Sequence, residues 1–261
     1  MRAATPQVHL IARPELDYDE VAAYLHDVGG ASWLERVDRG EMDDAQNLAE
    51  FAGRICYRSW EPGLNPNVRR VRTDQSAYLQ NILASAHGSV LEHVNFTFVL
   101  HDVSRVVTHE LVRHRAGTAV SQESLRFVRL DDLPFWFPDW AEEDTELRER
   151  AAELLGRMEE FQRWMAGHFG LDEEGVNFGE KKAKTSFMRR FAPEGLATGL
   201  VWTANVRTLR HVIESRTSKG AEEEIRLVFG RLAELMAKEA PALFGDYEVE
   251  DGAWTPKWRK V

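Results

Sequence analysis

The clearest hydrophobic pattern along the chain is the alternation at residues 94–101. This segment is rich in β-branched and aromatic residues and places Phe96 and Phe98 on one face, which predicts a half-buried β-strand. A second apolar run, at residues 196–203, predicts a buried strand, although its length leaves a helix open. Shorter runs predict two more strands, at residues 7–12 and 127–130.

Helical spacing of apolar residues dominates the rest of the chain. In the longest case, residues 147–169, Leu155 and Met158 belong to one apolar stripe. Ser104 and Asn205 are candidate N-caps, because their side chains can accept from free backbone N–H groups. Strands and helices are mixed without regular β–α–β alternation, which predicts an α+β fold. The predicted helices cover residues 17–29, 43–57, about 79–86, 104–115, 147–169, 205 to at least 213, and 221–239.

Composition and charge narrow the class of protein. The length of 261 residues predicts a single domain over residues 1–261. The net charge of -10 argues against a general nucleic-acid binder. No apolar run approaches the roughly 18 residues that span a membrane, and residues 1–6 lack the order of a signal peptide. One cysteine, Cys56, excludes an internal disulfide and is expected to be buried. We therefore expect a soluble, cytoplasmic protein with no nucleic-acid or membrane partner.

Several familiar catalytic signatures are absent. The chain has no Gly-x-Gly-x-x-Gly, no P-loop and no Gly-x-Ser-x-Gly. His109-Glu110 begins like the helix of a zinc hydrolase, but the next histidine, His114, is five residues on. That spacing is about 140° around a helix, so the two imidazoles cannot share one metal. No metal site is predicted.

The unusual stretch runs from Arg113 to Arg126, where three arginines and a histidine flank what we expect to be a small, hydroxyl-rich loop. Guanidinium groups bind phosphate with two parallel bonds, so this stretch suits a phosphorylated small molecule. The alternative is a surface cluster paired with carboxylates. Two further cationic groups stand out. Arg189 and Arg190 lie among aromatic residues and are expected to be partly buried, and the second group comprises Asn205, Arg207, His211 and Arg216.

These motifs resemble the signature of the flavin-dependent thymidylate synthases. In that family Arg-His-Arg is followed by seven residues, a serine, one residue and an arginine. Here eight residues separate Arg115 from Ser124, and we place the extra one within residues 116–120. The segment His87-x-Ser89-x-x-Glu-His and the group Asn205-x-Arg207-x-x-x-His211 with Arg216 resemble further family segments. The matches span residues 54 to 216 in order.

The resemblance implies an α+β fold with a mixed or antiparallel central sheet flanked by helices. It also implies a homotetramer with active sites shared between subunits. FAD is expected to contact His87, Ser89, Arg113, His114, Arg115, Gln122, Asn205, Arg207 and His211. The pyrimidine nucleotide is expected to contact Glu110, Glu123, Ser124, Leu125, Arg126, Arg189 and Arg216. Of these, the catalytic candidates are Arg216, Ser124 and Arg126.

The implied reaction is C5-methylation of dUMP to dTMP. Methylenetetrahydrofolate supplies the carbon, and FAD reduced by NADPH supplies the hydride. We interpret Ser124 as a ligand-binding hydroxyl, because no base is visibly assigned to activate it. Three alternatives stay open: a UMP methylase making a modified nucleoside, a non-catalytic nucleotide- or RNA-binding protein, and a metal hydrolase.

Overall fold

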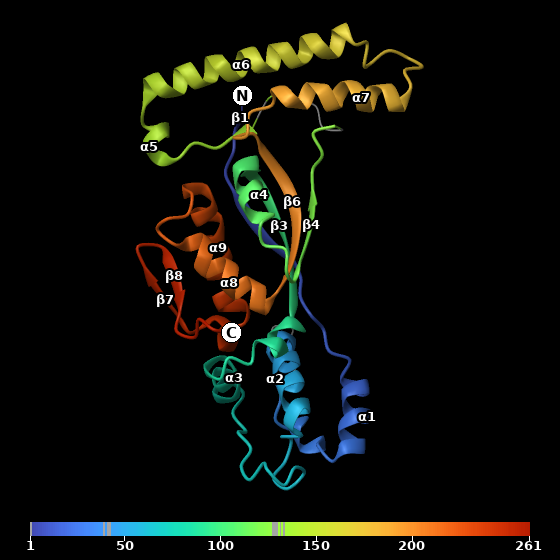
Figure 1. Ribbon diagram of the computed structural model, residues 1–261, viewed down its shortest axis with the longest axis vertical. Helices are drawn as coiled ribbons and strands as arrows, with labels where there is room; N and C mark the ends of the chain where they lie inside the picture. The colour runs from blue at the N-terminus through green and yellow to red at the C-terminus, as the bar shows by residue number, and fades with distance from the viewer. Residues whose placement is uncertain (1, 39, 41–42, 127–129, 131, 133) are drawn as a thin grey trace. The chain divides into compact units, whose positions relative to one another are not determined.

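The computed structural model describes residues 2–38, 40, 43–126, 130, 132 and 134–261 (Figure 1). The chain forms two compact units. Unit 1 comprises Met1–His9, Val99–Arg113 and Val120–Trp202, and unit 2 comprises Leu10–Phe98, His114–Ala119 and Thr203–Val261. The predicted single domain stays a prediction.

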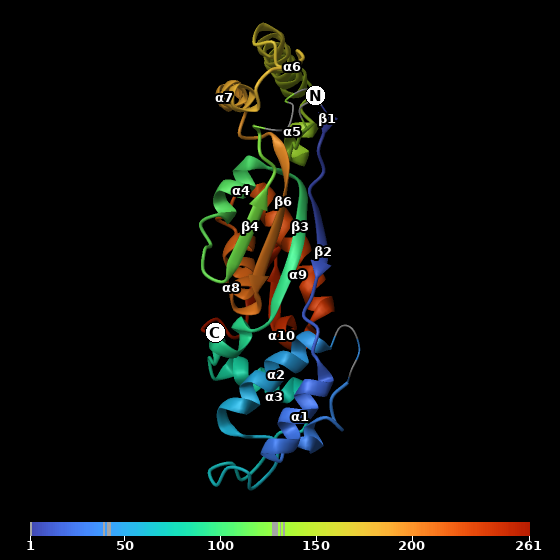
Figure 2. The same cartoon turned by 90° about the vertical axis from the view of Figure 1, so that its right-hand side faces the viewer.

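A four-stranded sheet has the strand order β2-β3-β6-β4 (Figure 2). Strand β4 pairs with β6 in antiparallel fashion, because Glu123 N donates to Gly199 O while Asn205 N donates to Gly117 O. The hydroxyls of Thr97 on β3 and Thr203 on β6 lie 2.9 Å apart. The strands are β2 (Gln7–Ala12), β3 (Asn95–Ser104), β6 (Ala197–Asn205) and β4 (Thr118–Gln122).

Three of these strands confirm predictions, and Phe96 and Phe98 are both fully buried. The prediction of a loop after Arg115 is wrong in part, because Thr118–Gln122 forms strand β4. Its small and hydroxyl residues hid a strand that is held by backbone bonds to β6 rather than by buried side chains. Of the strand predicted at 127–130, residues 127–129 lie outside the described residues.

Unit 2 holds most of the shorter helices. Asp17 caps α1 by accepting from Asp19 N and Glu20 N, and Gly29 ends it with a left-handed φ of 77°. Trp33 and Trp60 are buried in a cluster with residues of α1. The elements are α1 (Tyr18–Val28), η1 (Ala31–Trp33), α2 (Asp44–Tyr57), α3 (Gln75–Ala84), η2 (Gly88–Glu92), α8 (Val206–Thr217), α9 (Glu223–Glu239), α10 (Pro241–Phe244), β7 (Tyr247–Glu250) and β8 (Ala253–Pro256).

Unit 1 contains a pair of long helices, α6 and α7, that lie side by side (Figure 1). Gln162 on α6 donates to Met188 O at the end of α7, and Met165 and Met188 share a buried cluster. Helix α7 was not predicted, because its lysine-rich sequence looks like a solvated charge run. The elements are β1 (Arg2–Ala3), α4 (Arg105–Leu111), β5 (Pro134–Phe135), α5 (Asp139–Glu142), α6 (Thr145–His168), α7 (Phe178–Met188) and η3 (Arg189–Phe191).

Two predictions about single segments need correction. The helix capped by Ser104 ends at Leu111 instead of Arg115, so His114 lies outside it. Cys56 is exposed at the end of α2, where its thiol donates weakly to Ala52 O at 3.5 Å. Among the described residues, no helix is long and apolar enough to cross a membrane.

Candidate active site

His114 and Arg216 form the central contact of the candidate site in unit 2. Arg216, in the last turn of α8, donates from Nε to His114 Nε2 at 2.8 Å. Burial, followed by electrostatic repulsion from Arg216 and His211, lowers the pKa of His114 to about 4. The imidazole is therefore neutral at pH 7 and accepts through Nε2, which leaves its proton on Nδ1. The ring of His211 lies edge-on at 5.6 Å.

Hydrogen bonds connect the loop after His114 to the start of α8. The side-chain oxygen of Asn205, Oδ1, caps α8 by accepting a hydrogen bond from Thr208 N at 2.9 Å. The backbone N–H of Asn205 donates to Gly117 O. Thr208 also donates from Oγ1 to Ala116 O at 2.8 Å. Gly117 has a φ of 67°, and a Cβ there would collide with Asn205 Nδ2. Two motifs far apart in sequence are therefore brought together.

The segment that begins at His87 also meets α8. Arg207 donates from Nη1 to the Glu92 carboxylate at 2.6 Å and from Nε to Val261 O at 3.0 Å. His87 precedes η2, and its ring stacks on Tyr57 at 6.1 Å. All the predicted flavin residues except Arg113 and Gln122 belong to unit 2.

All the predicted nucleotide residues except Arg216 belong to unit 1. Glu123 is held by β6, because its carboxylate accepts from Gly199 N at 2.9 Å and from the Thr198 hydroxyl at 3.3 Å. Ser124 Oγ accepts from Arg126 N at 3.4 Å, so this serine belongs to a turn. These bonds fix the backbone of the segment that is predicted to bind the nucleotide.

A pocket of about 430 Å³ in unit 1 gathers arginines. Of the predicted nucleotide residues, only Leu125 and Arg189 line it. Arg105 was not named as a candidate in the sequence analysis. The feature that could have drawn attention to it is its position directly after Ser104, which caps α4. Burial, and then the positive charge of Arg189, lowers the pKa of Arg105. The lining residues, called the cationic pocket below, are Arg105, His109, Leu125, Ser186, Arg189, Arg190, Ala192, Pro193 and Glu194.

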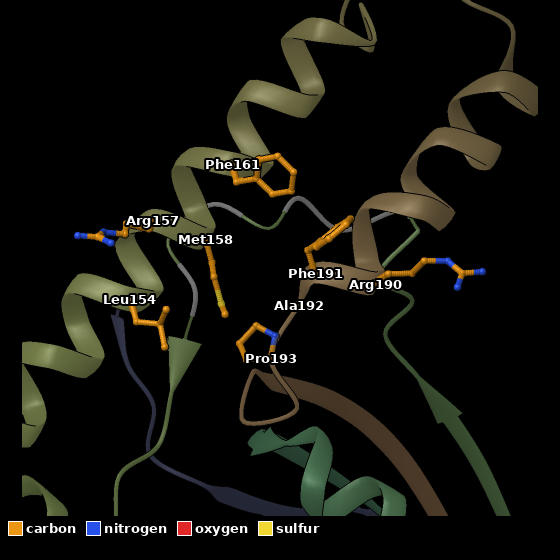
Figure 3. Close-up of a pocket in the computed structure, with 8 residues that line it drawn as sticks. All are labelled: Leu154, Arg157, Met158, Phe161, Arg190, Phe191, Ala192 and Pro193. Carbon is orange, nitrogen blue, oxygen red and sulfur yellow. The ribbon is translucent and has the colours of Figure 1, made fainter.

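A neighbouring pocket of about 420 Å³ shares Arg190, Ala192 and Pro193 with the cationic pocket but is otherwise mostly apolar (Figure 3). The guanidinium groups of Arg157 and Arg190 point away from its apolar lining (Figure 3). The expectation that Arg189 and Arg190 are partly buried is wrong, since both are exposed on η3.

The remaining predicted residues make fewer contacts. Arg113, Arg115 and Ser89 are exposed. Gln122 donates to the Thr108 hydroxyl at 3.3 Å, which ties β4 to α4. Within the described part of the chain, no three His, Cys, Asp or Glu side chains are grouped to hold a metal ion.

This chain is similar to known proteins both in its sequence and in its fold. A family profile described as "Thymidylate synthase complementing protein" matches residues 40–242. The flavin-dependent thymidylate synthase of Corynebacterium glutamicum is 35% identical over 221 residues, covering 80% of this chain and 82% of the relative. That of Mycobacterium tuberculosis is 35% identical over 213 residues, with coverage of 80% and 82%. Among solved structures, thymidylate synthase X (ThyX) from Helicobacter pylori with FAD and dUMP superposes with a TM-score of 0.54 at 21% identity, covering 77% of this chain and 93% of that one. This likeness confirms the predicted α+β fold.

Proposed function

Because the chain belongs to the flavin-dependent thymidylate synthase family, we propose that this enzyme methylates C5 of dUMP to form dTMP. We propose FAD as its cofactor, methylenetetrahydrofolate as its carbon donor and NADPH as its reductant. The observation that carries the proposal is the contact between the Arg113-His114-Arg115 segment and α8. His114 bonds to Arg216, and Gly117 bonds to Asn205. This contact joins residues that the resemblance assigns to the flavin and to the nucleotide.

The residues proposed for FAD suit that group chemically. Arg115 and Arg207 supply guanidinium groups for the diphosphate. Ser89 supplies a hydroxyl, and the neutral His114 has an N–H donor at Nδ1. Arg207 is also held in place by Glu92. A bound flavin would supply the hydride that completes the methyl group.

The residues proposed for the nucleotide orient it and stabilise charge. A guanidinium group near O4 of the uracil ring favours the negative charge that builds up when C5 becomes nucleophilic. We assign this part to Arg216 and Arg126. Ser124, held in a turn with Arg126, binds the nucleotide through its hydroxyl and needs no activating base.

Two further parts of the proposal concern the whole protein. A homotetramer with shared active sites rests on the family resemblance, and light scattering of the purified protein tests it. A cytoplasmic location is supported by the single cysteine, Cys56, which fits a reducing compartment.

Tritium release tests the reaction directly. [5-³H]dUMP and [5-³H]UMP are incubated in parallel with the enzyme, FAD, NADPH and methylenetetrahydrofolate. Faster release from dUMP supports the proposal. Faster release from UMP would move the enzyme to ribonucleotide methylation, and release from neither by flavin-loaded protein would remove the proposed reaction.

A further inference from the structure

The cationic pocket has an excess of positive charge. Arg105 begins α4, and Arg189 and Arg190 lie together on η3. Among the described residues that line the pocket, the only carboxylate belongs to Glu194, and it lies 3.5 Å from His109 Nδ1. Three arginines therefore line the pocket together with the carboxylate of Glu194, which attracts Arg105 and partly offsets the repulsion from Arg189.

Arg105 lines this pocket, and part of its guanidinium group is buried. Its Nη1 atom is buried and has no hydrogen-bond partner among the described residues. A buried N–H group without an acceptor destabilises a folded protein, so such groups are rare and call for an explanation. An anion in the pocket would relieve the repulsion between the guanidinium groups of Arg105 and Arg189, a repulsion that lowers the pKa of Arg105.

The other lining groups match a phosphate ester better than a bare ion. Ser186 adds a hydroxyl donor to the guanidinium groups. Leu125, Ala192 and Pro193 add an apolar wall, and the volume of about 430 Å³ leaves room for more than a phosphate group. The pocket thus offers donors for an oxyanion and a surface for the less polar part of the same molecule.

We propose that Arg105 is a further substrate-binding residue, which binds the phosphate group of the nucleotide in the cationic pocket together with Arg189 and Arg190. The identity of the phosphate ester rests on the proposed function. Anion binding by Arg105 does not, because it follows from the pocket alone.

Calorimetric titration with inorganic phosphate tests the anion site without any turnover. We expect Arg105→Gln to weaken phosphate binding about tenfold or more, because a charge-assisted bond is lost. Arg105→Lys keeps the charge but loses the planar fork, so its loss should be smaller. Arg157→Gln is the matched control, because Arg157 is exposed, pairs with Glu153 and does not line the cationic pocket. Thermal melting shows whether each variant folds, and if Arg105→Gln does not fold, Arg105→Lys decides.

A second titration compares dUMP with deoxyuridine, which lacks the phosphate. We expect Arg105→Gln to weaken dUMP binding about tenfold and to leave deoxyuridine binding unchanged. Phosphate that binds wild type and Arg105→Gln equally, or does not bind wild type, overturns the proposal. An enzyme that binds phosphate through Arg105 but turns over neither dUMP nor UMP would keep the anion site and lose the proposed function.

Discussion

Arg216 donates from its Nε to the Nε2 of His114 at 2.8 Å, across 102 positions of sequence. The resemblance assigns His114 to the flavin and Arg216 to the nucleotide. A direct bond between them means that a ligand which moves one side chain also changes the orientation of the other. The bond requires a neutral imidazole, which the low pKa of His114, about 4, provides at pH 7.

We expect Arg216→Ala to raise the KM for dUMP by about 10- to 100-fold, since a charge-assisted contact is lost. His114→Ala should raise the KM less, about three- to tenfold, because Arg216 keeps its charge and loses only the bond to His114 that helps to orient it. Steady-state kinetics of the two variants and of the double variant measure the coupling. If the two effects simply add, the bond between the side chains does not orient Arg216.

The same histidine predicts how stability changes with pH. The pKa of His114 falls from 6.5 to about 4 on folding, so between these values the unfolded chain binds more protons than the folded one. The contribution of the neutral His114 to the free energy of unfolding is complete above pH 6.5 and is lost as the pH falls to about 4. The side chain is only partly buried, so we expect a loss of about 1–2 kcal/mol, well below the full value of the shift. Urea unfolding at pH 7 and pH 4.5 measures it. His114→Gln should show a flatter profile, and an equally steep one would assign the effect to other groups.

Cys56→Ala should keep nearly full activity. The thiol is exposed, and it makes a weak hydrogen bond to Ala52 O within its own helix. The proposed chemistry uses no thiol, and an exposed substitution typically changes the free energy of unfolding by less than about 0.5 kcal/mol. Tritium release and a urea titration check both statements. Lost turnover in a folded, flavin-loaded variant would give the thiol a part in the reaction.

How much the sequence predicts depends on which interactions hold each element. Strands β3 and β6 were predicted because their apolar residues, such as Phe96 and Trp202, are buried. Strand β4 was missed because it is held by backbone bonds to β6, which leave no pattern in its side chains. Helix α7 was missed because only Met188 of its residues is buried.

In the candidate site, too, some residues belong to a recognisable sequence pattern and others do not. The motif residues His114, Asn205 and Arg216 were found because they recur at family spacing, and α8 brings them together through its cap and its last turn. Arg105 belongs to no quoted motif. It becomes a candidate only because the fold places Arg105 and Arg189 in the lining of one pocket, a proximity between distant segments that no local pattern encodes.

Gly117→Ala should damage the loop that carries His114. A φ of 67° strains any residue other than glycine, and the added Cβ would collide with Asn205 Nδ2 and lie 2.6 Å from Thr208 Oγ1. We expect a loss of about 1–3 kcal/mol in the free energy of unfolding and weaker FAD retention, because the cap of α8 is displaced. The control is Gly156→Ala within α6, where a Cβ meets nothing within 4 Å and should stabilise by about 0.5–1 kcal/mol. Urea unfolding and flavin absorbance measure both variants. If Gly117→Ala unfolds and binds FAD like wild type, the contact between the loop and Asn205 does not support the site.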